Sequence, residues 1–253
     1  MKLYDQMAEQ YDRSRPSYPD DVIDEILGDV SEELSVLDVG SGTGIASRQM
    51  KSRGADVIGL DMSTGMSAVA EQHGIVTELA PFETWDSAGR TFDRVTCAQA
   101  WHWMDPFSSA LKAASVIRPG GRLCLFWSAG HHPDDLADAL AAAYERVLPA
   151  DSPKMTLGYA VSRSSDLPLD FSVVTGSPRA FAHMVEEPAR SFPWSATYTR
   201  DQWIDELGTH TDHAALPADV RQNLFDEIGG TIDRFGGAFS MTFSTYLMSA
   251  TLL

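Results

Sequence analysis

Short apolar runs and longer mixed segments alternate regularly along the first half of the chain. Each run has the length of a strand that is buried on both faces of a sheet. The runs cover residues 34–39, 56–60, 75–79, 92–98 and 122–127. Because helix-length segments separate them, the pattern predicts a parallel sheet with right-handed crossovers. We therefore expect an α/β fold, a Rossmann-like, doubly wound and mostly parallel sheet with helices on both faces.

The segments between the runs carry helix signals. A glycine cluster at residues 40–44 leads into the first helical stretch. Ser63 can cap the next helix, which ends at Gly74. Asp105 followed by Pro106 is a strong start for the helix before the fifth run. These boundaries support the alternation of strands and helices.

The alternation ends after Ser128, and the rest of the chain is organised differently. An amphipathic helix is predicted over residues 133–148, whereas residues 149–187 show no clear period. Further predicted elements are strands at 189–198 and 241–252 and helices at 199–207 and 217–234. The predicted parts are a cofactor-binding core with an N-terminal cap segment (1–129), a helical lid or substrate-binding insertion after strand five (130–187), and a C-terminal completion of the sheet (188–253).

The charge of the chain limits its partners. The formal net charge is −17, and only 19 Lys and Arg residues are spread along the length. No cationic surface is expected to neutralise phosphates, so nucleic acid and anionic membranes are poor partners. The chain has no run of 18 apolar residues and no apolar signal core near its N-terminus, and we expect a cytoplasmic protein that neither spans a membrane nor is secreted. Nothing in the sequence indicates an oligomeric state.

The cysteines and histidines give no pattern typical of a metal site. Cys97 and Cys124 stand inside apolar runs and are expected to be buried core residues. Four histidines come in close pairs, but no Cys or carboxylate accompanies them at ligand spacing, so we expect surface histidines and no metal. These four are His131, His132, His210 and His213.

Three glycines, Gly40, Gly42 and Gly44, follow the first apolar run. A loop that brings backbone N–H groups against a ligand before a helix needs residues without a Cβ atom. A dinucleotide site uses G-x-G-x-x-G, whereas Ile45 occupies the position of the third glycine here. Asp61 ends the second run, where a carboxylate can accept both hydroxyls of a ribose. The pattern predicts a nucleoside cofactor, and its spacing disfavours a dinucleotide.

Several segments resemble one known family. Residues 36–44 (Val-Leu-Asp-Val-Gly-Ser-Gly-Thr-Gly) resemble the first motif of class I S-adenosylmethionine-dependent methyltransferases, and residues 59–63 (Gly-Leu-Asp-Met-Ser) resemble their acidic second motif. Residues 92–103 and 116–121 are similar to the fourth- and fifth-strand segments of the small-molecule branch, which includes trans-aconitate-type methyltransferases. Residues 11–19 also fit that branch.

The resemblance implies S-adenosyl-L-methionine as the cofactor. The glycine loop would hold its methionyl part with Asp38 beneath the loop, Asp61 would bind the ribose, and Met62 would pack on the adenine. Pro81 replaces the acidic residue that often binds the adenine edge, so Glu83 or the Phe82 backbone would take this role. The implied cofactor-binding residues are Tyr11, Arg15, Tyr18, Asp38, Gly40, Ser41, Gly42, Thr43, Gly44, Asp61, Met62, Phe82, Glu83 and Ala98.

Two of these assignments concern the borders of the site. Ala98, at the end of the fourth run, would border the methionine moiety of the cofactor. Tyr11, Arg15 and Tyr18 precede the first predicted helix and would close over the cofactor. An alternative is that these three belong to a solvated N-terminal helix.

The chemistry of methyl transfer demands little of the protein. A sulfonium methyl group is already activated, so the protein mainly holds the nucleophile in line and excludes water. A general base is required only where the nucleophile has to lose a proton. His102 is the candidate, because it follows the fourth run and histidine titrates near neutral pH. Trp101 and Trp103 can wall the substrate pocket, or the three residues can form an inert cluster that packs the loop.

These observations predict an enzyme, a methyltransferase that transfers a methyl group to an O, N or C nucleophile of a small-molecule metabolite by in-line displacement. One alternative is an NAD(P)-dependent Rossmann oxidoreductase, which shares the wound sheet and Asp61. Ile45 and residues 101–103 argue against it. The other alternative is a non-catalytic protein that binds adenosylmethionine, since a fold alone does not prove activity.

Overall fold

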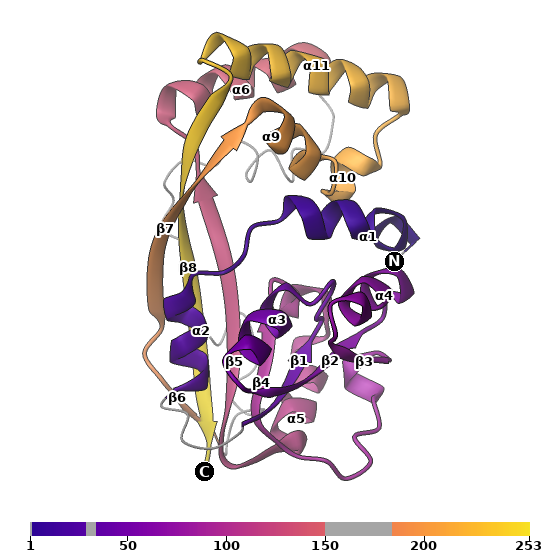
Figure 1. Cartoon of the computed structure of the whole chain (residues 1–253), viewed down its shortest axis with the longest axis vertical. Helices are drawn as coiled ribbons and strands as arrows, with labels where there is room; N and C mark the ends of the chain where they lie inside the picture. Colours follow the sequence, from indigo (N-terminus) through magenta and orange to yellow (C-terminus); the bar gives the residue numbers. More distant parts are fainter. Residues whose placement is uncertain (1, 29–33, 150–183) are drawn as a thin grey trace.

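A computed structural model describes residues 2–28, 34–149 and 184–253 of the chain. Among these residues, eight strands form one sheet in the order β3-β2-β1-β4-β5-β8-β6, and β7 also pairs with β8 (Figure 1). Strands β1 to β5 are parallel, whereas β8 is antiparallel to β5, β6 and β7. The predicted Rossmann-like, mostly parallel sheet is confirmed.

The elements follow each other along the chain with helices between the parallel strands. The strands are β1 (Ser35–Val39), β2 (Asp56–Asp61), β3 (Val76–Leu79), β4 (Phe92–Ala98), β5 (Ile117–His131), β6 (Met184–Glu186), β7 (Arg190–Thr199) and β8 (Ala238–Leu252). The helices are α1 (Lys2–Ser14), α2 (Asp20–Leu27), α3 (Ile45–Ser52), α4 (Thr64–Gln72), α5 (Pro106–Val116), α6 (Asp134–Val147), α9 (Arg200–Leu207), α10 (Thr211–Ala214) and α11 (Ala218–Arg234), with short 3₁₀ turns η1 (Phe82–Thr84) and η2 (Trp101–Trp103).

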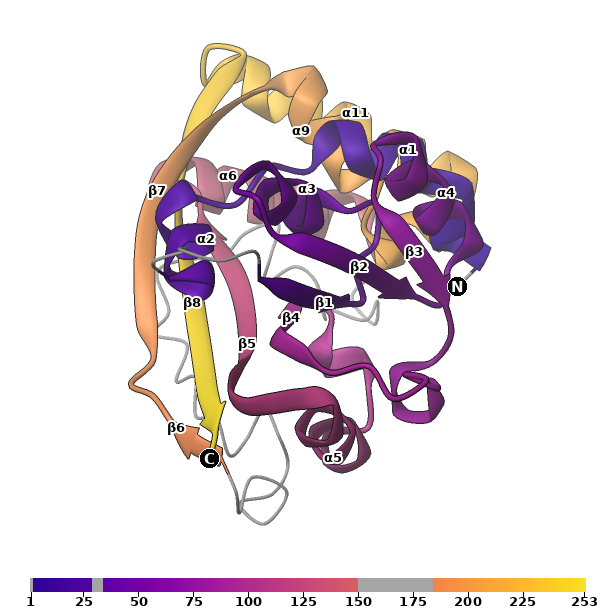
Figure 2. The same cartoon turned by 60° about the horizontal axis from the view of Figure 1, so that its bottom comes forward.

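Strand β1 shows why the apolar runs form a doubly covered sheet. Successive side chains of a strand point to opposite faces. Val36 packs in one core with Met50 of α3, and Leu37 packs in another core with Ala110 of α5. Figure 2 shows α3 and α4 on one side of the strands and α5 on the other. Apolar residues at successive positions of β1 therefore have packing partners on both faces of the sheet.

Strands β5 and β8 extend beyond the predicted residues 122–127 and 241–252. They pair along their length, from Arg122 opposite Thr251 to His131 opposite Thr242. The added residues of β5 after Trp127 are not strongly apolar, so the hydrophobic pattern does not mark them. Their backbone groups find partners on β8, which the sequence does not place beside them.

Helices α6, α9, α10 and α11 form a helical layer at the top of Figure 1. Leu140, Trp203 and Ile228 share its apolar core with Phe239 and Phe243 of β8. The segment after residue 188 both completes the sheet and supplies three of these helices, and α9 and α11 lie where helices are predicted at 199–207 and 217–234. Most of the predicted lid, residues 150–183, lies outside the described residues. Across the described ranges, no helix has the length and apolarity to cross a membrane.

Helix α1 lies between the helical layer and the parallel part of the fold (Figure 1). Asp12 on α1 accepts hydrogen bonds from Arg48 of α3 at 2.8 and 3.2 Å. On the side of the helical layer, Asp205 of α9 accepts from Arg13 and Gln10 at 2.9 to 3.0 Å. These contacts tie α1 to both layers across the carboxyl edge of the sheet.

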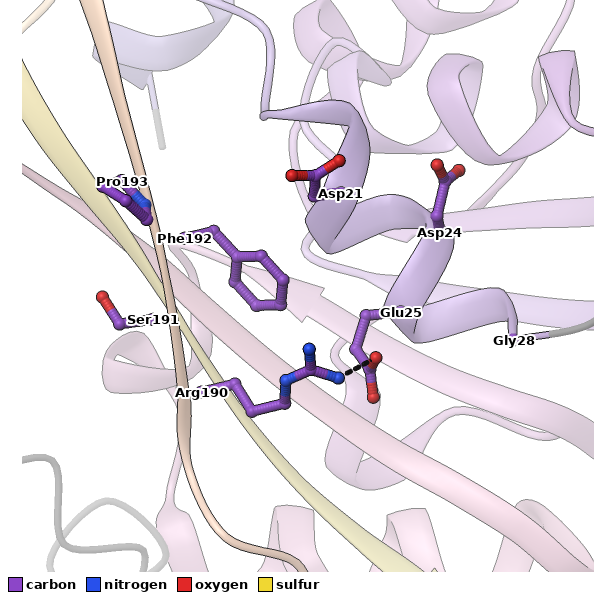
Figure 3. Close-up of a pocket in the computed structure, with 8 residues that line it drawn as sticks. All are labelled: Asp21, Asp24, Glu25, Gly28, Arg190, Ser191, Phe192 and Pro193. Carbon is purple, nitrogen blue, oxygen red and sulfur yellow. Dashed lines mark hydrogen bonds and ion pairs between the residues drawn. The ribbon is translucent and has the colours of Figure 1, made fainter.

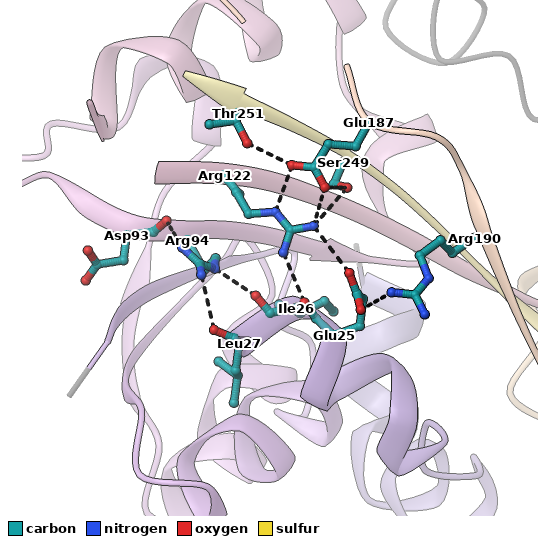
Figure 4. A network of polar contacts seen from close by, with 10 residues as sticks. All are labelled: Glu25, Ile26, Leu27, Asp93, Arg94, Arg122, Glu187, Arg190, Ser249 and Thr251. Carbon is teal, nitrogen blue, oxygen red and sulfur yellow. Dashed lines mark hydrogen bonds and ion pairs between the residues drawn. The ribbon is translucent and has the colours of Figure 1, made fainter. Parts of the chain in front are cut away.

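A polar network holds α2 against the back of the sheet (Figure 4). Arg94 donates to the carbonyl oxygens of Ile26 and Leu27 at 2.7 and 3.1 Å. The last carbonyls of a helix have no partner within the helix, so these bonds satisfy them. Arg122 donates to Glu187 at 2.5 and 3.0 Å and so joins β5 to the segment after β6. The network is structural and lies away from the carboxyl edge.

The cysteines are buried and free, as predicted, but the histidines differ from the prediction. His132 and His213 are each 4% exposed, so the assignment to the surface is wrong for these two. Nε2 of His213 shares a hydrogen bond of 2.7 Å with the Tyr144 hydroxyl. Among the described residues, no group of three or more His, Cys, Asp and Glu side chains is placed to hold a metal ion.

His132 predicts a measurable acid sensitivity of the helical layer. Its ring lies 4.9 Å from that of Trp203 and 5.3 Å from that of Phe239, and neither ring nitrogen has a hydrogen-bond partner among the described residues. Burial lowers the pKa of His132 from 6.5 to about 4. Between these values the unfolded chain binds the proton and the folded chain does not, so stability is lost as the pH falls through this window.

We expect His132→Phe to remove this loss. The variant keeps a ring between Trp203 and Phe239 but cannot titrate. Denaturant unfolding at pH 8 and pH 5 is expected to show that the wild type loses about 2 kcal/mol more on acidification than the variant does. Equal losses in both proteins would contradict the assignment of a neutral, buried His132.

Candidate cofactor-binding and active site

The carboxyl ends of β1 and β4 lie side by side at the point where the strand order reverses. The loop of residues 40–44 follows β1, and the turn of residues 99–104 follows β4. Asp38 of β1 stands opposite Thr96 of β4 in the register of the two strands. Ligands of wound α/β sheets bind at this kind of crevice, so the candidate site is built from these two connections.

The three glycines of the loop have different reasons to be glycine. All have positive φ, +65° at Gly40, +55° at Gly42 and +81° at Gly44. A Cβ atom on Gly40 would lie 2.5 Å from Cβ of Ala100 in the turn after β4. A Cβ atom on Gly44 would lie 3.3 Å from Cβ of Ala70. Packing against Ala100 therefore requires a glycine at position 40, and the contact at Gly44 would only be tight, whereas Gly42 has nothing within 4 Å of such an atom.

Gly42 and Asp61 are joined in the structure. The Gly42 N–H donates to Oδ2 of Asp61 at 2.8 Å, and the Ser63 N–H donates to Oδ1 at 2.8 Å. Both oxygens keep further lone pairs. The carboxylate is therefore oriented at the end of β2, directly beside the glycine loop, as the sequence motif predicts.

Asp38 lies beneath the loop and is almost completely buried, at 1% exposure. Its carboxylate accepts from Ser47 Oγ at 2.5 Å and from Thr96 Oγ1 at 2.8 Å. Burial is the main cause that raises the pKa of Asp38 to about 6, and the charge of Asp61 adds to it. The two hydroxyl donors act in the opposite direction. Asp38 thus titrates much nearer neutrality than an exposed aspartate.

The hydroxyl side chains of the loop point into the protein. Thr43 is 1% exposed. Ser41 Oγ would stand 2.7 Å from a Cβ atom on Gly59, so it faces β2. This oxygen is buried and has no hydrogen-bond partner among the described residues. A ligand at this loop would therefore meet mainly the backbone, and the buried Ser41 hydroxyl has unused hydrogen-bonding capacity.

Tyr11, Arg15 and Tyr18 gather near the end of β1, but their place in the chain differs from the prediction. Tyr11 lies within α1, which the hydrophobic pattern did not mark. The guanidinium of Arg15 lies 4.9 Å from the ring centroid of Tyr11 and donates to Thr209 Oγ1 at 3.1 Å. The ring of Tyr18 packs edge-on against Phe126 of β5 at 4.8 Å. Helix α1 is held to both layers, so the alternative of a solvated N-terminal helix does not describe it.

The pKa of Tyr18 shows how close this group lies to the candidate site. Burial raises the pKa of Tyr18 well above its ordinary value, and the charge of Asp38 contributes to the shift. The side chain therefore stays neutral and remains a hydrogen-bond donor near the base of the glycine loop.

The predicted adenine-side residues divide into two groups. Met62 is 48% exposed and Ala98 is half-buried, so both remain accessible to a ligand. Phe82 is 3% exposed, and its ring is part of the core. Glu83 accepts from the Asp105 N–H at 3.1 Å and from Ser109 Oγ at 3.2 Å. Both bonds go to Oε1 of Glu83, which ties this carboxylate to the start of α5, and its role at the adenine edge stays a prediction.

The two tryptophans of η2 have opposite environments. Trp101 is 1% exposed and packs against Phe82 at 6.4 Å between ring centroids. It is a core residue, and the prediction that its side chain walls the substrate pocket is wrong. Trp103 is 66% exposed, and its ring lies 5.0 Å from that of His102. Partial burial lowers the pKa of His102, which favours the neutral imidazole that a general base requires.

Sequence reasoning missed the residues that position these groups. Ser47 and Thr96 hold Asp38, and Gln99 takes a positive φ of +59° at the end of β4. This conformation is uncommon for a residue with a side chain. It is fixed by a bond of 3.0 Å from the Gln99 N–H to the Phe126 carbonyl. Thr96 is two residues before Ala98, but its role depends on strand pairing that a single sequence does not reveal.

Two pockets border α1 and α2 away from this crevice. A pocket of about 650 Å³ lies between α2 and β7, where Arg190 pairs with Glu25 beside Asp21 and Asp24 (Figure 3). The other, of about 810 Å³, lies between α1 and the helical layer, with Arg15 and Tyr198 in its lining. The first is remote from the ends of β1 and β4, and its acidic wall does not suit the anionic groups of a nucleotide. The second shares Arg15 with the candidate site.

Comparison with known proteins identifies similar sequences. The methyltransferase domain family matches residues 37–125. An uncharacterized methyltransferase from Mycobacterium tuberculosis is 40% identical over 227 residues, which cover 86% of this chain and 80% of that protein. A ubiquinone biosynthesis O-methyltransferase from Alkalilimnicola ehrlichii is 33% identical over 131 residues, 49% of this chain and 52% of that protein.

Solved structures show the same fold. A protein from Anaeromyxobacter dehalogenans described as a type II methyltransferase matches with a TM-score of 0.64 at 19% identity, covering 94% of this chain and 98% of that one. Phosphoethanolamine N-methyltransferase 2 from Haemonchus contortus, in complex with phosphomonomethylethanolamine and S-adenosylhomocysteine, matches with a TM-score of 0.55 at 15% identity and covers 98% of this chain and 57% of that one.

Proposed function

The chain belongs to the class I S-adenosylmethionine-dependent methyltransferases, and from this premise we propose that it methylates an O, N or C nucleophile of a small-molecule metabolite. Membership rests on the relative that is 40% identical over 86% of the chain. It leaves the oxidoreductase alternative without support. The observation that carries the proposal is the oriented pair of the Gly42 N–H and the Asp61 carboxylate at the strand switch point.

The residues at this edge fit S-adenosylmethionine, the cofactor of the family. Open space at Gly42 leaves room for a ligand against the loop backbone, and the oriented carboxylate of Asp61 can accept ribose hydroxyls. We assign the loop of residues 40–44, Asp61 and Met62 to hold the cofactor. When bound, the cofactor supplies a methyl group on a sulfonium sulfur.

Two features support a small acceptor. Helix α1 and the helical layer stand over the same end of the sheet, so a large folded acceptor would have little room (Figure 1). The net charge of −17 disfavours nucleic acid. The nucleophile stays open in the proposal, because the relatives include O-methyltransferases of ubiquinone biosynthesis and the fold neighbours include a phosphoethanolamine N-methyltransferase.

Incubation with methyl-labelled S-adenosylmethionine tests the proposal. The acceptor panel should contain phenols, carboxylic acids, primary and tertiary amines and activated carbon acids, with protein and RNA as separate samples. We expect label in one class of small molecule and none in the macromolecules. Transfer to protein or RNA alone would contradict the proposal.

We expect His102→Ala to lower turnover by about 10² or more while cofactor affinity stays within twofold, because general base catalysis contributes roughly 10² to 10⁴. Steady-state rates on the labelled acceptor and calorimetric titration with S-adenosylmethionine measure the two effects. His102→Gln keeps a hydrogen-bonding side chain that cannot act as a base near neutral pH, so this variant should be as slow as the alanine variant. Unchanged turnover in both variants would make His102 a packing residue of η2.

A further inference from the structure

Asp38 is a buried carboxylate without a cationic partner among the described residues. Only 1% of the residue is exposed, and its two oxygens accept from neutral hydroxyls, Ser47 Oγ and Thr96 Oγ1. Ion pairs in the described part of the chain include Asp12 with Arg48 and Asp93 with Arg118, but none involves Asp38. A buried charge without a counter-ion costs free energy, so burial favours the protonated, neutral carboxyl of Asp38.

The groups that face Asp38 from each neighbouring element add to this effect. Asp61 comes from the end of β2, Cys97 from β4, and Tyr18 from the segment between α1 and α2. The two hydroxyls come from α3 and β4. Of these groups, Asp61 acts on Asp38 through a negative charge, which raises the pKa of Asp38 further. Arg15 acts on the neighbouring Tyr18, but no cation of the described ranges is among the groups that shift the pKa of Asp38 itself.

We propose that Asp38 senses the positive charge of S-adenosylmethionine, holding a proton in the empty site in mildly acidic solution and releasing it to solvent when the cofactor binds. The O–H bond of the carboxyl breaks, its electron pair stays on the carboxylate, and the buffer takes up the proton. The sulfonium and ammonium groups of the cofactor outweigh its one carboxylate and would supply the counter-charge that the described residues do not provide at Asp38. The inference rests on the cofactor of the proposed function and not on the acceptor.

The location of Asp38 makes this coupling possible. It precedes Gly40 by two residues and lies directly below the loop assigned to the methionyl part of the cofactor. Because Asp38 is buried, its interaction with a nearby charge is screened less than at the surface. The raised pKa of Asp38, about 6, puts the exchange in an accessible range.

Isothermal titration calorimetry with S-adenosylmethionine alone tests the proposal. Titrations at pH 6.0 in two buffers of different ionisation enthalpy give the number of protons released, which we expect to be about half a proton per site. We also expect affinity at pH 5.5 to be about fourfold weaker than at pH 7.0. The amino group of the cofactor stays protonated over this range, so it does not contribute.

Two variants assign the proton to Asp38. Asp38→Asn is expected to abolish the release at pH 6.0 and to flatten the pH dependence of affinity. Asp93→Asn, which removes a carboxylate at the opposite end of the sheet beside Ser35, is the matched control and should release as many protons as the wild type. If Asp38→Asn does not fold, Ser47→Ala replaces it, because loss of this donor should move the release to higher pH.

The outcomes separate this inference from the proposed function. Binding of S-adenosylmethionine without any proton release in the wild type would overturn the role of Asp38 and leave the methyltransferase assignment intact. Release that persists unchanged in Asp38→Asn, or in Ser47→Ala at an unchanged pH, would also overturn it. Absence of any binding of the cofactor would count against both.

Discussion

Asp61→Ala is expected to weaken the binding of S-adenosylmethionine by more than tenfold, at least about 1.4 kcal/mol. The carboxylate accepts from Gly42 and Ser63 at 2.8 Å, so its position is already determined without ligand. A hydrogen bond to a charged acceptor contributes about 1.5 to 3 kcal/mol, and a ribose offers two hydroxyls. Calorimetric titration at constant pH measures the loss directly.

Asp56→Ala provides the matched control for this variant. Asp56 stands at the start of the same strand and is exposed, at the amino end of the sheet. Its removal changes the net charge by the same amount, so a general electrostatic effect on the cofactor would appear in both variants. Full affinity in Asp61→Ala, or an equal loss in both variants, would sink the assignment of Asp61 to the ribose.

The parallel half of the fold could be predicted from the sequence because its central strands are buried on both faces. A short apolar run such as residues 34–39, followed at once by a glycine cluster, is typical of such a strand. The order of the glycines and the acid at Asp61 then point to the candidate site, since both stand at carboxyl ends of predicted strands. In this half of the chain, the strands that the apolar runs predict are the strands of the parallel sheet.

The helical layer could not be predicted to the same extent. Its helices come from two distant stretches of the chain, α6 and α9 to α11, and they meet because β5 and β8 pair from Arg122 to His131. That pairing leaves no local signal, since the residues after Trp127 in β5 are not strongly apolar. The sequence therefore predicts the helices at 133–148, 199–207 and 217–234 one by one but not their assembly into a single layer.

In the candidate site, too, the sequence does not reveal the surroundings of single side chains. Trp101 and Trp103 flank one histidine in sequence, yet one is 1% and the other 66% exposed. The 3₁₀ turn η2 rotates consecutive side chains by about a third of a turn, so neighbours face different surroundings. Likewise, the glycine motif predicts a ligand loop, but it does not reveal that Gly40 is required by Ala100.

Gly40→Ala is expected to lower the free energy of unfolding by about 3 kcal/mol, through backbone strain at positive φ and overpacking against Ala100. For a chain of this size that corresponds to a melting temperature about 6 to 12 °C lower, measurable by calorimetry without ligand. Ala100 belongs to the turn that leads to η2, and relief of the 2.5 Å contact would move this turn away from the loop.

Gly42→Ala separates the two demands on the loop. Its φ of +55° carries a similar backbone strain, but the added methyl group meets nothing within 4 Å, so we expect a loss of only about 1 kcal/mol. The methyl group would instead occupy open space at the loop where the cofactor is assigned, and affinity for S-adenosylmethionine should fall by more than tenfold. A Gly42→Ala protein that binds the cofactor normally, or one as unstable as Gly40→Ala, would show that the open side of the loop is not the ligand side. Comparison of the pair therefore tests whether the glycines serve the fold and the cofactor separately.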